Sequence, residues 1–330
     1  MLKNRETYLC LSAMLRAREG KMLNAERAER MLEAPSFEDA AKLLTDCGYE
    51  DMSQMNAEEI EKALTARKAE IMEELDRLAP DRLISDIFRV KYDYHNAKVL
   101  LKAEAMGQSP DRLLSDAGRI AGRQMKEYYH EGKYSSMPGS LGKAAAEAKE
   151  YLAKSSNPQQ MDFMLDKACF AEMTELAEES GNAYLKDYVK LLIDCANLKS
   201  TVRTLRMGKN RDFLQETLIP GGKISADRLL TSTDKESLTG LYVHSGLEKA
   251  AALGAEAAEG GTLTAFERAC DNAVNAYLEK AKLVSFGSEP LTAYLASLEN
   301  EITAARMILT GRLAGVQPKA LRERLRDFYA

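Results

Sequence analysis

The chain contains no tryptophan and only three histidines in 330 residues. Its five cysteines are scattered, odd in number and without a Cys-x-x-Cys pair; they are Cys10, Cys47, Cys169, Cys195 and Cys270. This pattern fits a reduced cytosolic compartment, in which single cysteines pack as small apolar residues. With the histidines far apart at His95, His130 and His244, histidine-centred catalysis has few arrangements open to it.

Several motifs that carry chemistry are also missing. There is no glycine-rich phosphate loop, no Gly-x-Ser-x-Gly sequence and no Asp-Asp pair, which disfavours a nucleotide-binding loop, a serine hydrolase and a helical terpenoid synthase. No apolar run reaches 18 residues, so we expect no membrane span. The first 20 residues carry charges inside their apolar stripe and lack the apolar core of a signal peptide. We therefore expect a cytoplasmic chain.

Charge and length narrow the function further. Asp and Glu outnumber Lys and Arg by 51 to 46, for a net charge of −5, which argues against a nucleic-acid partner. A chain of this length buries a large core and should divide into two or three domains.

The apolar residues that are present recur with helical spacing, and convincing strands are absent. Residues 37–47 place Phe37, Ala40, Ala41 and Leu44 on one face and are followed by Gly48, a natural helix stop. Breaks rich in Pro and Gly separate the segments, for example at residues 137–139 and 220–222. The sequence predicts an all-α protein.

One pattern occurs three times at nearly equal intervals: Asn, then Lys or Arg six residues later, then Gly five residues after that. The copies are Asn96, Lys102 and Gly107; Asn197, Arg203 and Gly208; and Asn300, Arg306 and Gly311. Repetition at a fixed interval indicates copies of one structural unit. We therefore predict three similar helical-bundle domains, with approximate bounds 1–133, 134–232 and 233–330.

The first two copies align without gaps over residues 86–107 and 187–208. Identical pairs include Asp93 with Asp194 and Asn96 with Asn197, whereas the third copy has Ser297 at the Asp position. Asn is a poor residue inside a helix, so its recurrence favours a buried polar network at equivalent positions of three helices, with each Gly at a helix end. The alternative is inheritance from a duplicated ancestor without present energetic value.

Two local features invite a chemical interpretation. Glu127 and His130 have the Glu-x-x-His spacing of di-iron bundles, but no second such motif exists, so we expect no metal. Residues 199–211 hold five basic groups and no acid. These groups form a candidate surface for docking an acidic partner, the alternative being ordinary solvated or ion-paired cations; they are Lys199, Arg203, Arg206, Lys209 and Arg211.

The segment RVKYDYHNAKVLLKA (89–103) resembles the signature helix of a V-type and archaeal-type ATPase or ATP synthase family, whose members are the C subunits of prokaryotes and the d subunits of eukaryotes. Tyr8 to Leu23, residues 43–49, LKSTVRTLRMGK with the following LIPGG, and residues 298–311 are similar to other parts of that family. The double glycine at 220–222 is reduced to Gly118 in the first copy and is missing from the third. Residues 134–160 and 245–262 match nothing in the family pattern.

The resemblance implies a mechanical function without an active site or cofactor. Members of the family form a funnel of three helical domains around a pseudo-threefold axis. They sit on the membrane rotor ring at the cytoplasmic side and receive the foot of the central stalk, so that they couple the rotating shaft to proton or sodium transport. Two other interpretations remain: a soluble helical-bundle enzyme with an unrecognised carboxylate or tyrosine site, and a helical scaffold unrelated to ion pumping.

Overall fold

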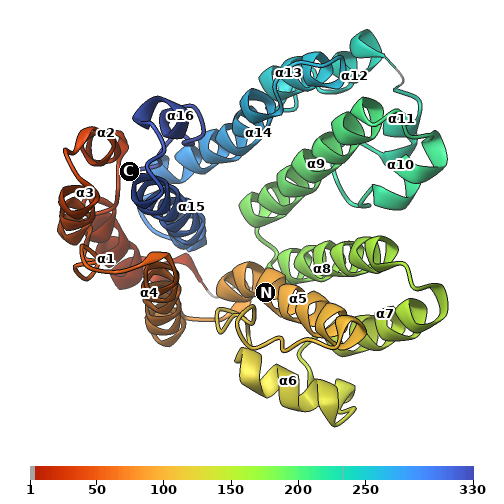
Figure 1. The fold of residues 1–330 in the computed structure, drawn as a ribbon, viewed down its shortest axis with the longest axis horizontal. Coiled ribbons are helices and arrows are strands. Elements are labelled where there is room, and N and C mark those ends of the chain that lie inside the picture. The colour runs from red at the N-terminus through yellow and green to blue at the C-terminus, as the bar shows by residue number, and fades with distance from the viewer. Residues whose placement is uncertain (1–3, 233) are drawn as a thin grey trace. The chain divides into compact units, whose positions relative to one another are not determined.

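The computed structural model describes residues 4–232 and 234–330. Within these residues every regular element is an α-helix or a 3₁₀-helix, and none is a strand (Figure 1). The predicted all-α class is confirmed. None of the described helices combines the length and apolar character needed to cross a membrane. The division into three domains and the funnel stay predictions.

The chain folds into two compact units, which are described separately. Unit 1 consists of residues 83–232 and 234–242. Its helices are α5 (Leu83–Met106), α6 (Gly122–His130), η3 (Tyr134–Ser136), α7 (Leu141–Ser155), α8 (Pro158–Ser180), α9 (Ala183–Arg206), α10 (Arg211–Thr217), α11 (Ala226–Leu230) and α12 (Lys235–Leu241). The central helix of this unit is α8, because it packs against α5, α7 and α9.

Unit 2 consists of residues 4–82 and 243–330. Its helices are η1 (Arg5–Tyr8), α1 (Leu9–Glu19), α2 (Ala25–Glu33), α3 (Phe37–Leu43), η2 (Leu44–Cys47), α4 (Ala57–Leu78), α13 (Glu248–Ala258), α14 (Leu263–Leu278), η4 (Glu279–Leu283), α15 (Ser288–Leu313) and α16 (Pro318–Arg322). In Figure 1, the early and late helices of the chain, drawn in red and blue, together make up this unit. The core is α15, which contacts α1, α2, α3, α4, α14 and α16 and is buried at every position from Pro290 to Leu298.

The three copies of the sequence pattern lie on three long helices, α5, α9 and α15. Each helix ends in the same way: the residue after a left-handed glycine donates its N–H to a carbonyl five residues back. The bonds are Gln108 N to Ala103 O, Lys209 N to Thr204 O, and Val316 N to Gly311 O, at 2.8–3.1 Å. This is the bond that a glycine cap makes at the end of a helix, and the glycines are Gly107, Gly208 and Gly315.

The expectation that Gly311 ends the third helix is therefore wrong. Helix α15 continues to Leu313, and Gly315 takes the left-handed conformation in its place. The structure gives Gly311 a different function, because a Cβ there would overlap the side chain of Leu321. The absence of a side chain at Gly311 lets α16 pack directly on α15.

Candidate functional site

The asparagines of the first two copies hold loops by identical pairs of hydrogen bonds. Asn96 donates from Nδ2 to the carbonyl of Ser115 and accepts the N–H of Ser115 at Oδ1, both at 2.8 Å. Asn197 makes the same two bonds, also at 2.8 Å, with Ile219. When a side-chain amide pairs with the backbone N–H and carbonyl of one residue, the amide N–H, the amide oxygen and both backbone groups all have hydrogen-bond partners. Polar groups need such partners in order to be buried. Both asparagines are fully buried, so that part of the prediction is confirmed.

The aspartates one turn earlier hold the same two loops a few residues further on. Asp93 accepts the N–H of Arg119 at 2.9 Å. Asp194 accepts the N–H groups of Lys223 and Ile224, both at 3.2 Å. Burial raises the pKa of both aspartates, and the hydrogen bonds from the loops oppose the rise. We call each Asp–Asn pair with its loop a loop tether.

A glycine makes each aspartate bond sterically feasible. A Cβ built on Gly118 would overlap Oδ1 of Asp93, and one built on Gly222 would overlap Oδ1 of Asp194. Both glycines precede a basic residue and an isoleucine, in Gly-Arg-Ile and Gly-Lys-Ile. The glycine in each triplet is therefore required by the close approach of the helix carboxylate to the loop backbone.

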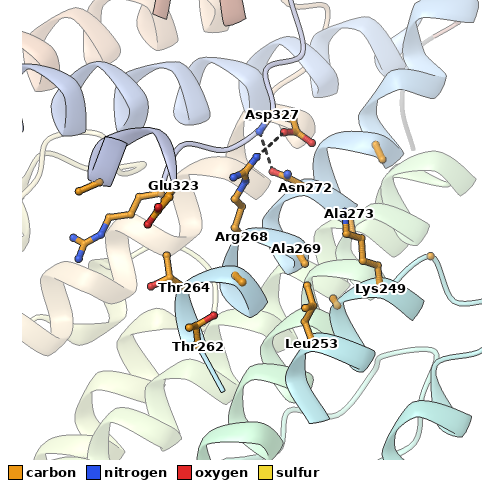
Figure 2. Close-up of a pocket in the computed structure, with 16 residues that line it drawn as sticks. Lys249, Leu253, Thr262, Thr264, Arg268, Ala269, Asn272, Ala273, Glu323 and Asp327 are labelled. Atoms are coloured by element: carbon orange, nitrogen blue, oxygen red, sulfur yellow. Dashed lines mark hydrogen bonds and ion pairs between the residues drawn. The ribbon is translucent and has the colours of Figure 1, made fainter. Parts of the chain in front are cut away.

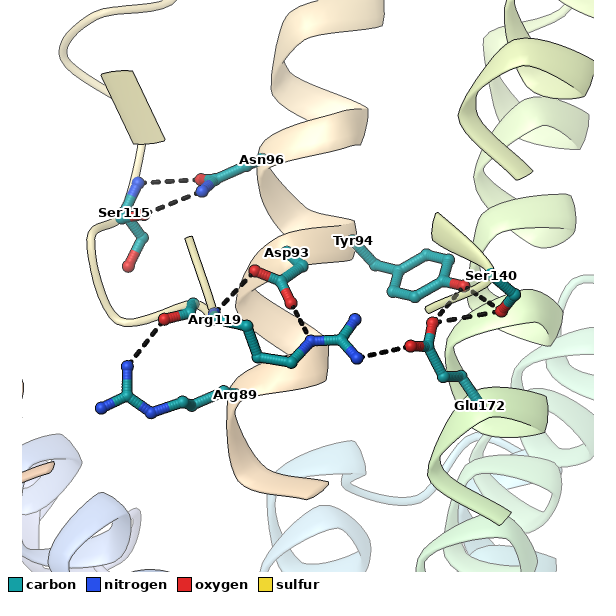
Figure 3. Close-up of polar contacts among 9 residues, drawn as sticks. Arg89, Asp93, Tyr94, Asn96, Ser115, Arg119, Ser140 and Glu172 are labelled. Carbon is teal, nitrogen blue, oxygen red and sulfur yellow. Dashed lines mark hydrogen bonds and ion pairs between the residues drawn. The ribbon is translucent and has the colours of Figure 1, made fainter. Parts of the chain in front are cut away.

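In the first tether, the basic residue is part of a buried ionic network (Figure 3). The guanidinium of Arg119 donates to Asp93 at 2.6 Å through Nε and to Glu172 of α8 at 2.5 Å through Nη1. Glu172 also accepts the hydroxyl of Tyr94 at 2.9 Å and that of Ser140 at 3.1 Å. The network ties the loop to α5 and α8, which are neighbouring helices of unit 1.

The third copy keeps the position of the asparagine but not its environment. Asn300 is partly exposed and makes one hydrogen bond, from Nδ2 to the carbonyl of Asp327, at 3.0 Å. The prediction that it is buried in the same way as Asn96 and Asn197 is therefore wrong. The residue after it, Glu301, is buried instead, as are Ser288, Thr292 and Ser297 of the same helix. Adjacent residues are about 100° apart around a helix, so the pattern alone could not show which of the two faces the core.

In the first and third copies, the basic residue of the pattern makes an ion pair to a neighbouring helix. Lys102 pairs with Asp162 of α8 at 2.6 Å, and Arg306 pairs with Glu61 of α4 at 2.5 Å. In the second copy, Arg203 is exposed on α9.

The predicted docking surface lies at the C-terminal end of α9 and just beyond it. Arg203, Arg206, Lys209 and Arg211 lie at the surface, and Lys199 is partly exposed. The side chain of Met207, in the middle of these cations, is 55% exposed. Lys209 stands over the ring of Phe213. The structure therefore places most of the predicted cations on the surface. It also adds an apolar side chain among them, which the run of basic residues did not indicate.

Unit 2 carries a groove of about 860 Å³ between α13, α14 and the C-terminal segment (Figure 2). Small side chains such as Ala250, Ala269 and Ala273 line it, and Lys249, Arg268 and Glu323 add charge. Asp327 lies at one end of the groove. Its N–H donates to Oδ1 of Asn272 at 2.9 Å, and its Oδ1 is 3.8 Å from Nη2 of Arg268. This groove could not be predicted from the sequence, because its lining comes from three separate segments.

The residues considered for metal chemistry lie on the surface of unit 1. Glu127 and His130 are both exposed on α6. Among the described residues, no group of three or more His, Cys, Asp or Glu side chains is arranged to hold a metal ion. No observation favours a catalytic site over the contacts described above.

These contacts define an all-α scaffold in which the same tether between a helix and a loop occurs twice. Residues 11–324 match the family described as ATP synthase (C/AC39) subunit, and the chain belongs to that family. This match confirms the family resemblance inferred from the sequence. Of the three interpretations of the sequence, it supports the one in which the chain is part of an ATP synthase. The chain is an accessory subunit rather than an enzyme with its own active site.

Curated relatives cover nearly the whole chain. The C subunit of the V-type sodium ATPase from Enterococcus hirae is 25% identical over 98% of this chain and 99% of its own length. The C subunit of the A-type ATP synthase from Methanocaldococcus jannaschii is 27% identical over 96% of this chain and 86% of its own length. A third relative, the corresponding A-type ATP synthase protein from Haloferax volcanii, is 26% identical over 95% of each chain.

Proposed function

We propose that this chain is a non-catalytic rotor subunit that couples the central stalk of a V/A-type ATPase or ATP synthase to the membrane rotor ring, and so to proton or sodium transport. The observation that carries the proposal is the family match over residues 11–324. In this proposal the three repeat units close into a funnel at the cytoplasmic face of the membrane, and the chain needs no cofactor.

The loop tethers suit a part that transmits torque. Such a part must resist shear, and long helices joined by buried hydrogen bonds and ion pairs deform little. Asp93, Asn96, Asp194 and Asn197 are all buried, and each fixes the backbone of a loop on a long helix. This explains why a poor helix former occurs in the middle of α5 and α9.

The basic end of α9 is the proposed docking surface within the complex. Its surface cations would attract an acidic partner protein, and Met207 would add an apolar contact. Charge reversal in Arg203→Glu/Arg206→Glu is expected to weaken assembly. The control is Arg123→Glu/Lys143→Glu, which makes the same charge change at side chains that are 91% and 82% exposed on α6 and α7.

The experiment compares complexes with and without this chain. Complexes without it are expected to retain ATP hydrolysis by the soluble head and to lose ATP-driven ion transport. Co-purification of the variant chains with the proteins of the head and ring then tests the docking surface. Ion transport without the chain would refute the coupling function, whereas equal co-purification of the two double variants would refute only the docking surface.

A further inference from the structure

One buried carboxylate of unit 2 holds both ends of a helical segment. Glu301 of α15 accepts the backbone N–H of Leu23 at 2.8 Å through Oε2 and the hydroxyl of Tyr49 at 2.6 Å through Oε1. Leu23 lies just before α2, and Tyr49 lies just after η2. We call residues 24–48 the α2–α3 hairpin. Both ends of this hairpin are therefore attached to the same side chain.

The environment of Glu301 disfavours its charge. The residue is 4% exposed, and no cation of the described chain forms an ion pair with it. Arg27 of α2, which donates to the carbonyl of Met22, and Arg67 of α4, which pairs with Glu70, are the cations that act to lower the pKa of Glu301. Its charge in turn raises the pKa values of Cys47, Tyr49 and Tyr294. A carboxylate in such a site pays a desolvation cost that its two hydrogen bonds only partly offset.

Two arginines outside the hairpin also hold it, and the charged groups in these contacts keep their charge near neutral pH. Arg312 donates to the carbonyls of Leu32 and Ala34. Arg322 binds Glu29, and this hydrogen bond holds the pKa of Glu29 below its ordinary value. Glu29 therefore stays ionised throughout the neutral range. Among these contacts of the hairpin, Glu301 is therefore the residue whose charge can change near neutral pH.

We propose that Glu301 is a proton-operated latch, which holds the α2–α3 hairpin on α15 while it is protonated and releases it more readily once it is ionised. Release exposes the carboxylate to water, which removes the cost of burying its charge. This gives unit 2 a stiffness that depends on pH. The proposal does not depend on the function proposed above, because it concerns contacts within unit 2 alone.

The direction in which pH shifts the opening of the hairpin follows from the difference in the pKa of Glu301 between the closed and open states. Burial raises the pKa of Glu301 to about 7 in the closed state, against an ordinary value near 4.5. The closed hairpin therefore holds the proton more tightly than the open one, so its extra stability is complete below pH 4.5 and is lost as the pH rises to 7. Each pH unit within that window changes the opening equilibrium by up to about tenfold, for a total on the order of 100-fold.

Hydrogen exchange of the full-length chain tests the latch. The opening equilibrium of peptides from residues 24–48 is measured between about pH 5 and 8.5, after correction for the intrinsic pH dependence of amide exchange. We expect opening to increase up to pH 7 and then level off, while peptides from α8 (Pro158–Ser180) show no such rise. In Glu301→Gln the rise should disappear. An equal rise in the wild type and in this variant would overturn the proposal.

Two further variants separate the latch from a general loss of stability. Glu29→Gln removes a contact of the hairpin that does not titrate in this range, so it should raise opening by a constant factor and preserve the pH dependence. Tyr49→Phe removes a donor that stabilises the ionised carboxylate, so it should move the transition to higher pH. If Glu301→Gln does not fold, an unshifted transition in Tyr49→Phe would by itself refute the latch.

Discussion

Asn96 and Asn197 each pair with the backbone of a single loop residue, through two hydrogen bonds of 2.8 Å whose partners lie 19 residues downstream in one copy and 22 in the other. The geometry of the contact is the same although the loops differ in length. Identical contacts at aligned positions are what a duplicated unit retains when the contact contributes to stability. This favours the polar-network interpretation of the pattern over inheritance without energetic value.

Replacing Asn197 with leucine should be costly, because it leaves the buried N–H and carbonyl of Ile219 without partners. An unpaired buried polar group costs about 1–3 kcal/mol, so we expect a loss of about 2–4 kcal/mol. Hydrogen exchange at the Ile219 amide gives the readout. The matched change, Asn300→Leu, removes one bond at a partly exposed site and should cost about 1 kcal/mol or less. Equal losses in the two variants would contradict this account.

Gly222→Ala should destabilise unit 1, because the added methyl group overlaps the carboxylate of Asp194. Overpacking of this kind costs about 1–3 kcal/mol. The control is Gly240→Ala on α12, where a Cβ meets no atom within 4 Å, and alanine there should stabilise the helix by about 0.5–1 kcal/mol. Thermal unfolding should therefore move the two midpoints in opposite directions. An unchanged midpoint for Gly222→Ala would show that the tether tolerates the extra atom.

Arg119→Met should be among the most damaging single changes in unit 1, because it leaves Asp93 and Glu172 buried together without their cation. Breaking a buried pair in this way costs about 3–5 kcal/mol. The loss should be smaller near pH 5 than near pH 8, because burial raises the pKa of Asp93 and protonation relieves the repulsion. Urea unfolding at both pH values measures this difference.

The control for that experiment is Lys223→Met at the corresponding position of the second tether. The Lys223 side chain is 48% exposed and pairs with Asp187 at 3.1 Å. An exposed ion pair contributes under about 1 kcal/mol, so this variant should unfold almost as the wild type does. A loss as large as that of Arg119→Met would mean that the tethers depend on the basic residue in both copies.

Docking through the basic end of α9 should weaken as salt is added, because exposed charges are screened within about 8–10 Å near 0.1–0.15 M salt. Binding of the purified chain to the other proteins of the complex is expected to fall with sodium chloride concentration. Lys209→Glu/Arg211→Glu should lower the affinity and flatten that dependence. A steep, unaltered dependence would place the docking charges elsewhere on the chain.

The helices and their repeated residues could be predicted because the signal is local. Apolar spacing, glycine caps and a recurring Asn are all visible within short segments. The partners of the asparagines could not be predicted, because Ser115 and Ile219 contribute backbone atoms that carry no residue signature. Gly118 and Gly222 gave a partial signal, but only the structure showed that the nearby aspartates require them.

The third copy shows a different limit. Glu299, Asn300 and Glu301 are consecutive polar residues, and the sequence favoured Asn300 as the buried one because the pattern repeats there. The packing of α15 against so many neighbours buries Glu301 instead. Which of three adjacent polar side chains turns inward depends on contacts with α2, α3 and α4, all of which lie far away in the sequence.

Because each loop is fastened to its helix at two points only one turn apart, the stretch of chain before those points can change length without disturbing them. The second copy already spans 22 residues between asparagine and partner, where the first spans 19. Related proteins can therefore diversify their surfaces by insertions just before Ser115 or Ile219. Such insertions leave the long helices and the loop tethers unchanged.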